Sequence, residues 1–126
     1  TPIKSSAASD VYKRQEDILY NSQFFIDDTG VLLGTYRKVH LFDSEKNYFT
    51  PGDQFKVFNT KIGRIGLFIC YDAFFPEAAR SLAIQGVDLL VNSTNWEKPY
   101  DYDIAKQMKH DYYTMLTERR PDVYIA

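Results

Sequence analysis

Residues 64–92, RIGLFICYDAFFPEAARSLAIQGVDLLVN, give the clearest indication of the fold of this chain. Its first seven residues, Arg64–Cys70, are apolar enough to form a buried strand, and Val87–Asn92 has the same character. Between these two runs the sequence predicts a helix over Glu77–Gln85. A strand, a helix and a second strand joined by short links predict a right-handed parallel βαβ unit.

The helix is predicted from residues at both of its ends. Pro76 is tolerated at the first helical position, and Glu77 places an acid where the helix dipole favours one. Gly86 is suited to the C-terminal cap, because glycine adopts the left-handed conformation that commonly ends a helix. The helix is therefore expected to end before Gly86.

Upstream of this unit the sequence predicts a hairpin and a short strand. Ser22–Ile26 and Val31–Tyr36 are β-rich runs around a turn in which Gly30 is suited to a positive φ. Arg37–Thr50 has mixed polarity and no clear period, which predicts a loop. Phe55–Asn59 is predicted as a short strand that leads into the βαβ unit.

Downstream, Asn92–Tyr102 is predicted as a loop, Ile104–Arg119 as a helix and Val123–Ala126 as the start of a strand. The order of elements indicates an α/β fold with a mixed sheet, the hairpin first and the parallel units later. Ligands of such sheets gather outside the carboxyl ends of the strands. Cys70 ends one strand and Asn92–Trp96 follows the next, so we expect these two places to be neighbours.

Composition bounds the possible functions. The 126 residues are 44% hydrophobic and 25% charged, which is ordinary globular usage and predicts one domain. A net charge of −2 gives no electrostatic case for nucleic acid or an anionic membrane. No apolar run approaches the ~20 residues that span a bilayer. The one cysteine excludes an internal disulfide and fits a reducing compartment, so we expect a cytoplasmic protein.

The first fifteen residues differ from the rest. Ser5–Gln15 is small and polar, then charged, and it resembles the in-frame translation of a sequencing-library adapter. The alternative is a disordered native terminus. We therefore divide the chain into residues 1–15, derived from an adapter or disordered, and residues 16–126, a partial domain.

The residues alone allow two interpretations of Cys70. A lone cysteine is more often a small buried hydrophobe than a catalytic group. However, it stands where an apolar strand stops, shortly before a helix. Free N–H groups and the dipole at a helix start favour the thiolate, which is the nucleophilic form. The following N–H, on Tyr71, could point at a developing oxyanion.

Other polar residues are weak candidates taken singly. Lys38 in a polar loop is normally solvated, and Glu45 is no stronger alone. His40 is better explained as packed or hydrogen-bonded, and His110 as a surface residue. No group of His, Cys, Asp and Glu has the spacing of zinc ligands, so no metal site is predicted.

Three segments in order resemble the nitrilase superfamily of carbon–nitrogen hydrolases. They are the lysine segment GTYRKVHLF at residues 34–42, the second-glutamate loop SEKNYFTPG at 44–52 and the nucleophile segment GLFICYDAFFPE at 66–77. Residues 79–91 and the pair Asn95-Trp96 continue the match, which covers about residues 20–96. One such segment alone would be weak evidence for membership of the family, but three segments in the family's order are specific evidence for it.

The resemblance implies a fold and a set of site residues. The family fold is an αββα sandwich, usually dimerised through helices, of which this chain would be a part incomplete at both ends. By position Cys70 resembles the nucleophile, Lys38 the catalytic lysine and Glu45 the second glutamate. Tyr71, together with Lys38, would form the oxyanion hole.

The resemblance also implies what the site lacks and what surrounds it. The family's first glutamate, its general base, lies upstream of anything here, so we expect these 126 residues alone to be inactive. Asn95 and Trp96 are candidates for the substrate pocket.

The implied reaction is hydrolysis of an amide or carbamoyl C–N bond of a small molecule through a cysteine thioester, without cofactor or metal. The complete protein would be a homodimer or higher homo-oligomer. The alternatives are a nitrile-hydrolysing nitrilase, or a non-catalytic binding member of the same fold. A thiol-redox domain would usually need a second cysteine, which the chain does not have. An acyltransferase relative would need membrane spans, which the sequence does not show.

Overall fold

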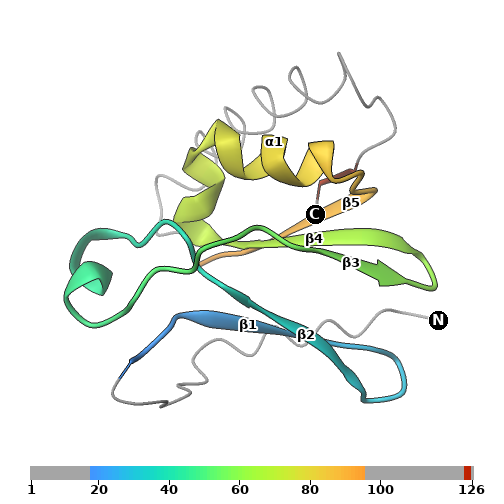
Figure 1. Cartoon of the computed structure of the whole chain (residues 1–126), viewed down its shortest axis with the longest axis horizontal. Helices are drawn as coiled ribbons and strands as arrows, with labels where there is room; N and C mark the ends of the chain where they lie inside the picture. Colours follow the sequence, from blue (N-terminus) through green and yellow to red (C-terminus); the bar gives the residue numbers. More distant parts are fainter. Residues whose placement is uncertain (1–17, 96–123, 126) are drawn as a thin grey trace. The chain divides into compact units, whose positions relative to one another are not determined.

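The computed structural model describes residues 18–95 and 124–125 (Figure 1). The chain divides into two compact units, Thr1–Gln54 and Phe55–Ala126, each of which is described by itself. The segment 1–15 and the helix predicted over Ile104–Arg119 lie outside the described residues.

The first unit is built on the predicted hairpin. Strand β1 (Ser22–Ile26) pairs antiparallel with β2 (Leu32–Arg37). Gly30 in the connecting turn has a φ of 88°, which confirms the positive φ expected there. The hairpin is therefore where the sequence places it, with β2 shifted by one residue.

One face of this hairpin is buried. Gln23 is paired with Tyr36 across the strands, and both are buried, as is Phe25 two residues along β1. Side chains alternate between the faces of a strand, so Lys38, two residues after Tyr36, continues this same face and is also buried. Lys38, which directly follows the hairpin, thus occupies a buried position.

The segment after the hairpin is more regular than predicted. Arg37–Thr50 was expected to be a loop, but Asp43–Asn47 forms a 3-10 helix, η1. A single short turn of this kind has no apolar period for sequence analysis to detect. Its first turn carries Glu45, so this short helix positions a candidate site residue.

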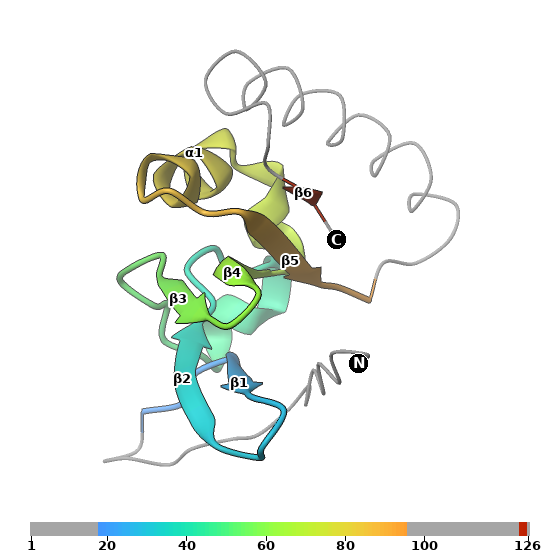
Figure 2. The ribbon, with the colours of Figure 1, turned by 90° about the vertical axis from the view of Figure 1, so that its right-hand side faces the viewer.

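The second unit holds a four-stranded mixed sheet. Its strands are β3 (Val57–Thr60), β4 (Gly63–Ile69), β5 (Leu89–Ser93) and β6 (Tyr124–Ile125). They lie in that order, β3 antiparallel to β4 and the later pairs parallel (Figure 2). The mixed sheet is confirmed, but its antiparallel strand is β3, because the β1–β2 hairpin forms a separate two-stranded sheet.

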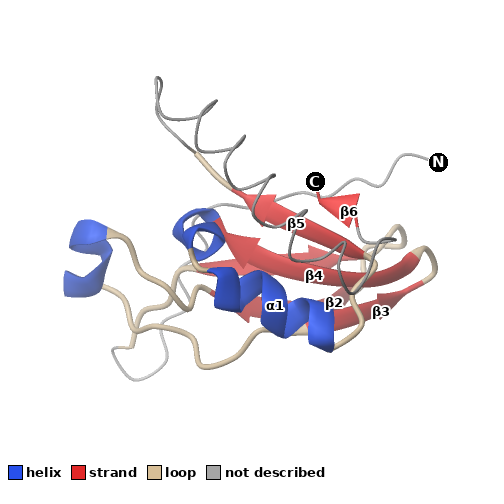
Figure 3. Ribbon diagram, turned by 90° about the horizontal axis from the view of Figure 1, so that it is seen from above, coloured by secondary structure: helices blue, strands red, loops and turns tan. Residues whose placement is uncertain are grey.

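The predicted helix covers this sheet. Helix α1 (Pro76–Ile84) begins at Pro76 and is followed by Gly86 with a φ of 81°, as the two end signals predicted (Figure 3). A Cβ built on Gly66 of β4 would lie 3.1 Å from side-chain atoms of Leu82 and Leu90. Leu82 of α1 therefore packs directly on the backbone of β4, and a glycine there allows the close approach.

No helix in the described part of the chain is long and apolar enough to cross a bilayer.

Candidate active site

Lys38 stands immediately after β2, and its backbone is held from two sides. Its N–H donates to the carbonyl oxygen of Asn21 at 2.8 Å, and its own carbonyl accepts from the N–H of Gly52 at 2.8 Å. The side chain is 2% exposed. Because an isolated buried ammonium is very costly, its charge needs a partner.

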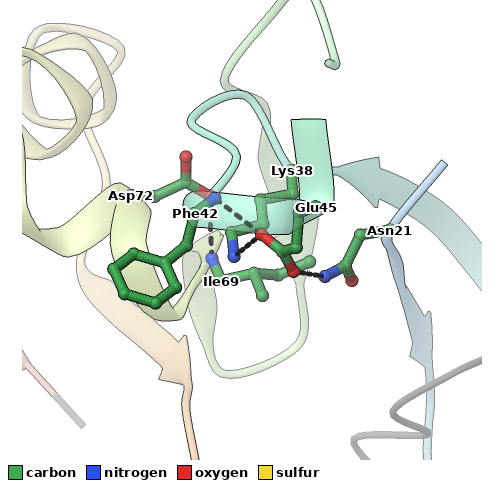
Figure 4. Close-up of polar contacts among 6 residues, drawn as sticks. All are labelled: Asn21, Lys38, Phe42, Glu45, Ile69 and Asp72. Carbon is green, nitrogen blue, oxygen red and sulfur yellow. Dashed lines mark hydrogen bonds and ion pairs between the residues drawn. The ribbon is translucent and has the colours of Figure 1, made fainter. Parts of the chain in front are cut away.

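Glu45 supplies that partner. Its Oε2 lies 2.6 Å from Lys38 Nζ and also accepts from the N–H of Phe42 at 2.7 Å (Figure 4). Its Oε1 accepts from Asn21 Nδ2 at 2.8 Å. Three donors from three parts of the chain thus converge on one carboxylate, which is 24% exposed.

These contacts set the ionisation of Glu45. Burial opposes the charged form and raises the pKa, but the hydrogen bond from Lys38, the Phe42 N–H, the charge of Lys38 and the amide of Asn21 together outweigh it. The pKa of Glu45 is consequently lowered from its ordinary value. At neutral pH the site holds an ion pair, in which the carboxylate fixes the direction of the lysine ammonium.

Cys70 lies in the second unit, at the end of β4. The predicted strand stops at Ile69, one residue earlier than expected, and Cys70 begins the 3-10 helix η2 (Cys70–Phe74). Its φ is 44°, in the left-handed region that residues with a Cβ seldom adopt. Such strained residues cluster at functional sites, and a nucleophile on a sharp strand-to-helix turn is one known form.

The turn at Cys70 is secured by a buried carboxylate. Asp72 is fully buried, and its Oδ2 accepts from the N–H of Ile69 at 3.0 Å (Figure 4). The Asp72 carbonyl accepts from the N–H of Phe75 at 3.1 Å. The contacts bind the strand end to the short helix, so Cys70 is held between two fixed residues while its own side chain stays partly exposed.

The strand register brings the predicted neighbours together. Ile69 of β4 is paired with Ser93 of the parallel strand β5. Cys70 and the segment that begins at Thr94 therefore leave the sheet at the same edge, as expected. Asn95 is exposed in that segment, and Trp96 lies outside the described residues.

Sequence reasoning missed two residues of these clusters. Asn21 carried no signal, because its partners Lys38 and Glu45 are distant in sequence and only the hairpin brings them near. Asp72 had a weak signal, as an acid in the first turn of a helical segment. Among the described residues no group of three or more His, Cys, Asp and Glu side chains could hold a metal ion.

The comparisons with known proteins agree on one family. The sequence model of the carbon–nitrogen hydrolases matches residues 4–116. A Schizosaccharomyces pombe protein named probable nitrilase is 48% identical over 99 residues, which are 77% of this chain and 36% of that protein. The N-carbamoylputrescine amidase of Solanum lycopersicum is 52% identical over 80 residues, 60% of this chain and 27% of the relative.

Solved structures show the same likeness. An amidase of the nitrilase superfamily from Nesterenkonia superposes with a TM-score of 0.70 at 26% identity, covering 76% of this chain and 37% of that one. Another structure of this amidase, with a TM-score of 0.64 and 28% identity, covers 70% and 36% and shows acrylamide added at its active-site cysteine. This likeness confirms the expected fold class, a mixed-sheet α/β arrangement that is part of the superfamily's fold.

The chain spans about a third of the length of these relatives. Its fold, its order of motifs and the match over residues 4–116 lead to one conclusion: the chain belongs to the carbon–nitrogen hydrolase family of the nitrilase superfamily.

Proposed function

We propose that the full-length protein hydrolyses an amide or carbamoyl C–N bond of a small molecule, with Cys70 as the nucleophile. The observation that carries the proposal is the backbone at Cys70, a left-handed residue between a buried strand and a short helix. A thiol held on such a turn is partly exposed, and the backbone N–H of the next residue, Tyr71, follows it directly in the chain. Strained backbone of this kind clusters at functional sites, which supports a catalytic role for Cys70.

The reaction proceeds in two halves. Cys70 gives its thiol proton to a base, and the thiolate adds to the substrate carbonyl carbon. The tetrahedral intermediate expels ammonia or an amine, which takes up a proton, and leaves a thioester. Water then adds with loss of a proton to the base, and the acid leaves as the thiolate is restored. By resemblance the base is a glutamate with no counterpart among these 126 residues.

Lys38 and the N–H of Tyr71 act on the oxyanion in this proposal. A fixed ammonium stabilises negative charge on the carbonyl oxygen as it develops, and one such donor is worth ~3 kcal/mol. Glu45 keeps the ammonium in place through the 2.6 Å ion pair, so little reorganisation is needed at the moment of attack. No metal or organic cofactor takes part in any step.

The substrate class rests on the relatives. The Solanum lycopersicum relative is named for a carbamoyl substrate and the Nesterenkonia relative is an amidase, which favours an amide or carbamoyl group. The Schizosaccharomyces pombe relative is named a nitrilase, so nitrile hydrolysis is the second candidate. Both reactions use the same nucleophile and differ in the group that the pocket accepts.

The test is ammonia release by the full-length protein from a panel of amides, carbamoyl compounds and nitriles. We expect activity on amides or carbamoyl compounds that falls at least about 1,000-fold in Cys70→Ala. Lys38→Ala is expected to lose about 100-fold to 1,000-fold, the usual effect of removing an oxyanion donor. Mass spectrometry of a proteolytic digest of the trapped acyl-enzyme should place the substrate's acyl mass on the peptide that contains Cys70.

The controls separate the possible outcomes. Ser44→Ala, an exposed change near Glu45 in sequence, is expected to keep wild-type rates. Activity confined to nitriles would move the protein to the second candidate. A folded Cys70→Ala variant with undiminished activity would overturn the proposal.

A further inference from the structure

Asn21 lies just before β1 and has no assigned role, yet it touches both members of the ion pair. Its side-chain amide donates to Glu45 Oε1 at 2.8 Å, and its backbone carbonyl accepts from the Lys38 N–H at 2.8 Å. These contacts join residues 24 and 17 positions apart in the chain. This one residue, just before the hairpin, therefore binds the glutamate by its side chain, as Figure 4 shows, and the lysine by its backbone carbonyl.

The side-chain contact does something that the other contacts do not. Lys38 Nζ and the Phe42 N–H both bind Oε2 of Glu45, so they fix one oxygen only. Rotation about the terminal Cγ–Cδ bond moves both oxygens, and because this torsion has a broad profile, contacts at one oxygen alone restrict it less than contacts at both. The amide of Asn21 binds the second oxygen and so further restricts rotation of the carboxylate plane.

The plane of the carboxylate in turn determines the direction of the Lys38 ammonium. Lys38 has a flexible four-carbon stem, and its ammonium is a point charge without a geometry of its own. Its position is therefore set by what holds it, and the 2.6 Å contact is to Oε2. A turn of the carboxylate would carry Oε2, and with it the ammonium, away from the position that an oxyanion needs.

We propose that Asn21 is a positioning residue that orients the Glu45 carboxylate and, through it, the Lys38 ammonium for oxyanion stabilisation. This inference rests on the proposed hydrolase function and adds a residue to it. Asn21 suits the task because its amide is a neutral donor at every working pH. An aspartate of the same shape would present a second carboxylate to Glu45, with no donor and with a repulsive charge.

The surrounding charges define the expected pH effect. Lys38, from the end of β2, is the ionised partner in hydrogen-bond contact with Glu45. Asp43 and Lys46, on the same short helix as Glu45, are exposed. Removing the Asn21 amide takes away one donor that favours the ionised carboxylate, so the acid limb of the pH–rate profile should move to higher pH.

The experiment compares Asn21→Ala and Asn21→Asp with wild type in the full-length protein. Both variants keep the backbone carbonyl that binds Lys38, so they remove the side-chain contact alone. We expect kcat to fall about 10-fold to 100-fold with little change in KM, since a small misplacement costs rate rather than binding. Asn21→Asp should be the slower of the two, and both should show the shifted acid limb.

A matched control adds the same charge elsewhere. Asn59→Asp, at an exposed position of β3, is expected to keep the wild-type kcat and acid limb. Thermal unfolding of each variant checks the fold, and the position of the acid limb does not depend on how much protein is folded.

The outcomes separate this inference from the function on which it rests. If folded Asn21 variants keep the wild-type kcat and acid limb while Cys70→Ala is inactive, the proposed role of Asn21 is overturned. The proposed hydrolase function is then retained. A loss of kcat without movement of the acid limb would also overturn it, because a structural defect alone behaves so. A wild-type protein inactive on the whole panel would refute the hydrolase function and this inference with it.

Discussion

At Glu45 a single carboxylate meets three donors, which come from before β1, from the end of β2 and from the residue before η1. Its pKa is lowered because these donors outweigh the cost of its burial. The ion pair with Lys38 therefore contributes to the stability of the folded state, and it is also part of the proposed site. Its two possible roles, in stability and in rate, can be measured separately.

The stability role predicts a pH dependence. Since the folded-state pKa of Glu45 is lowered, its contribution to stability is fully present above the unfolded-state pKa. It is lost as the pH falls through the folded-state pKa. We expect Glu45→Gln to be about 1–3 kcal/mol less stable at neutral pH, the cost of removing a charged hydrogen-bond partner, and to lose less stability than wild type on acidification.

Urea unfolding of the full-length protein over a pH series measures both effects. Glu77→Gln, which removes an exposed carboxylate in the first turn of α1, is the matched control and should keep the wild-type acid dependence. An acid dependence of Glu45→Gln equal to that of wild type would contradict this role of the ion pair.

Among the elements, α1 packs on β4, the strand that leads to Cys70. Leu82 is fully buried and lies against Gly66 of β4, whereas Ile84, two residues later on the same helix, is 69% exposed. The same helix therefore offers a buried and an exposed apolar residue of equal size. The packing of α1 on β4, rather than helix propensity, is expected to stabilise this part of the sheet.

Leu82→Ala is expected to reduce the free energy of unfolding by about 2–5 kcal/mol, because the removed methyl groups leave a cavity against the strand. Ile84→Ala should change it by about 0.5 kcal/mol or less, as exposed substitutions do. Urea unfolding of the two variants of the full-length protein provides the comparison. Equal losses would show that α1 does not pack on β4 in solution.

Considered as a whole, the molecule carries the lysine and the cysteine of the resemblance in different compact units. Lys38 and Glu45 belong to Thr1–Gln54, and Cys70 belongs to Phe55–Ala126. The chain also spans only about a third of the length of its relatives. We propose that the activity requires residues beyond these 126.

The 126-residue chain by itself is expected to release no ammonia above background from any amide of the panel. The physical reason is that no residue in it matches the family's general base, and a thiol without a base reacts slowly with an amide. The full-length protein serves as the positive control in the same assay. Ammonia release by the chain alone that disappears in its Cys70→Ala variant would contradict this expectation.

Local signals alone were enough to predict most of the elements. The turn at Gly30, the proline at the start of α1 and the glycine after its end each specify a backbone conformation within a few residues. The apolar runs likewise predicted β4 and β5 and their parallel pairing, because a helix must connect two such strands. The family resemblance also depended on contiguous segments and needed no tertiary contact.

Other features depend on contacts between distant residues. The sequence placed Lys38 and Glu45 in one loop, but neither the burial of the lysine nor the donation from Asn21 can be read from residues so far apart. The left-handed backbone at Cys70 likewise conflicts with the local preference of a residue that has a Cβ. These features depend on tertiary contacts, since a buried charge and a strained residue persist only when the surrounding contacts outweigh their cost.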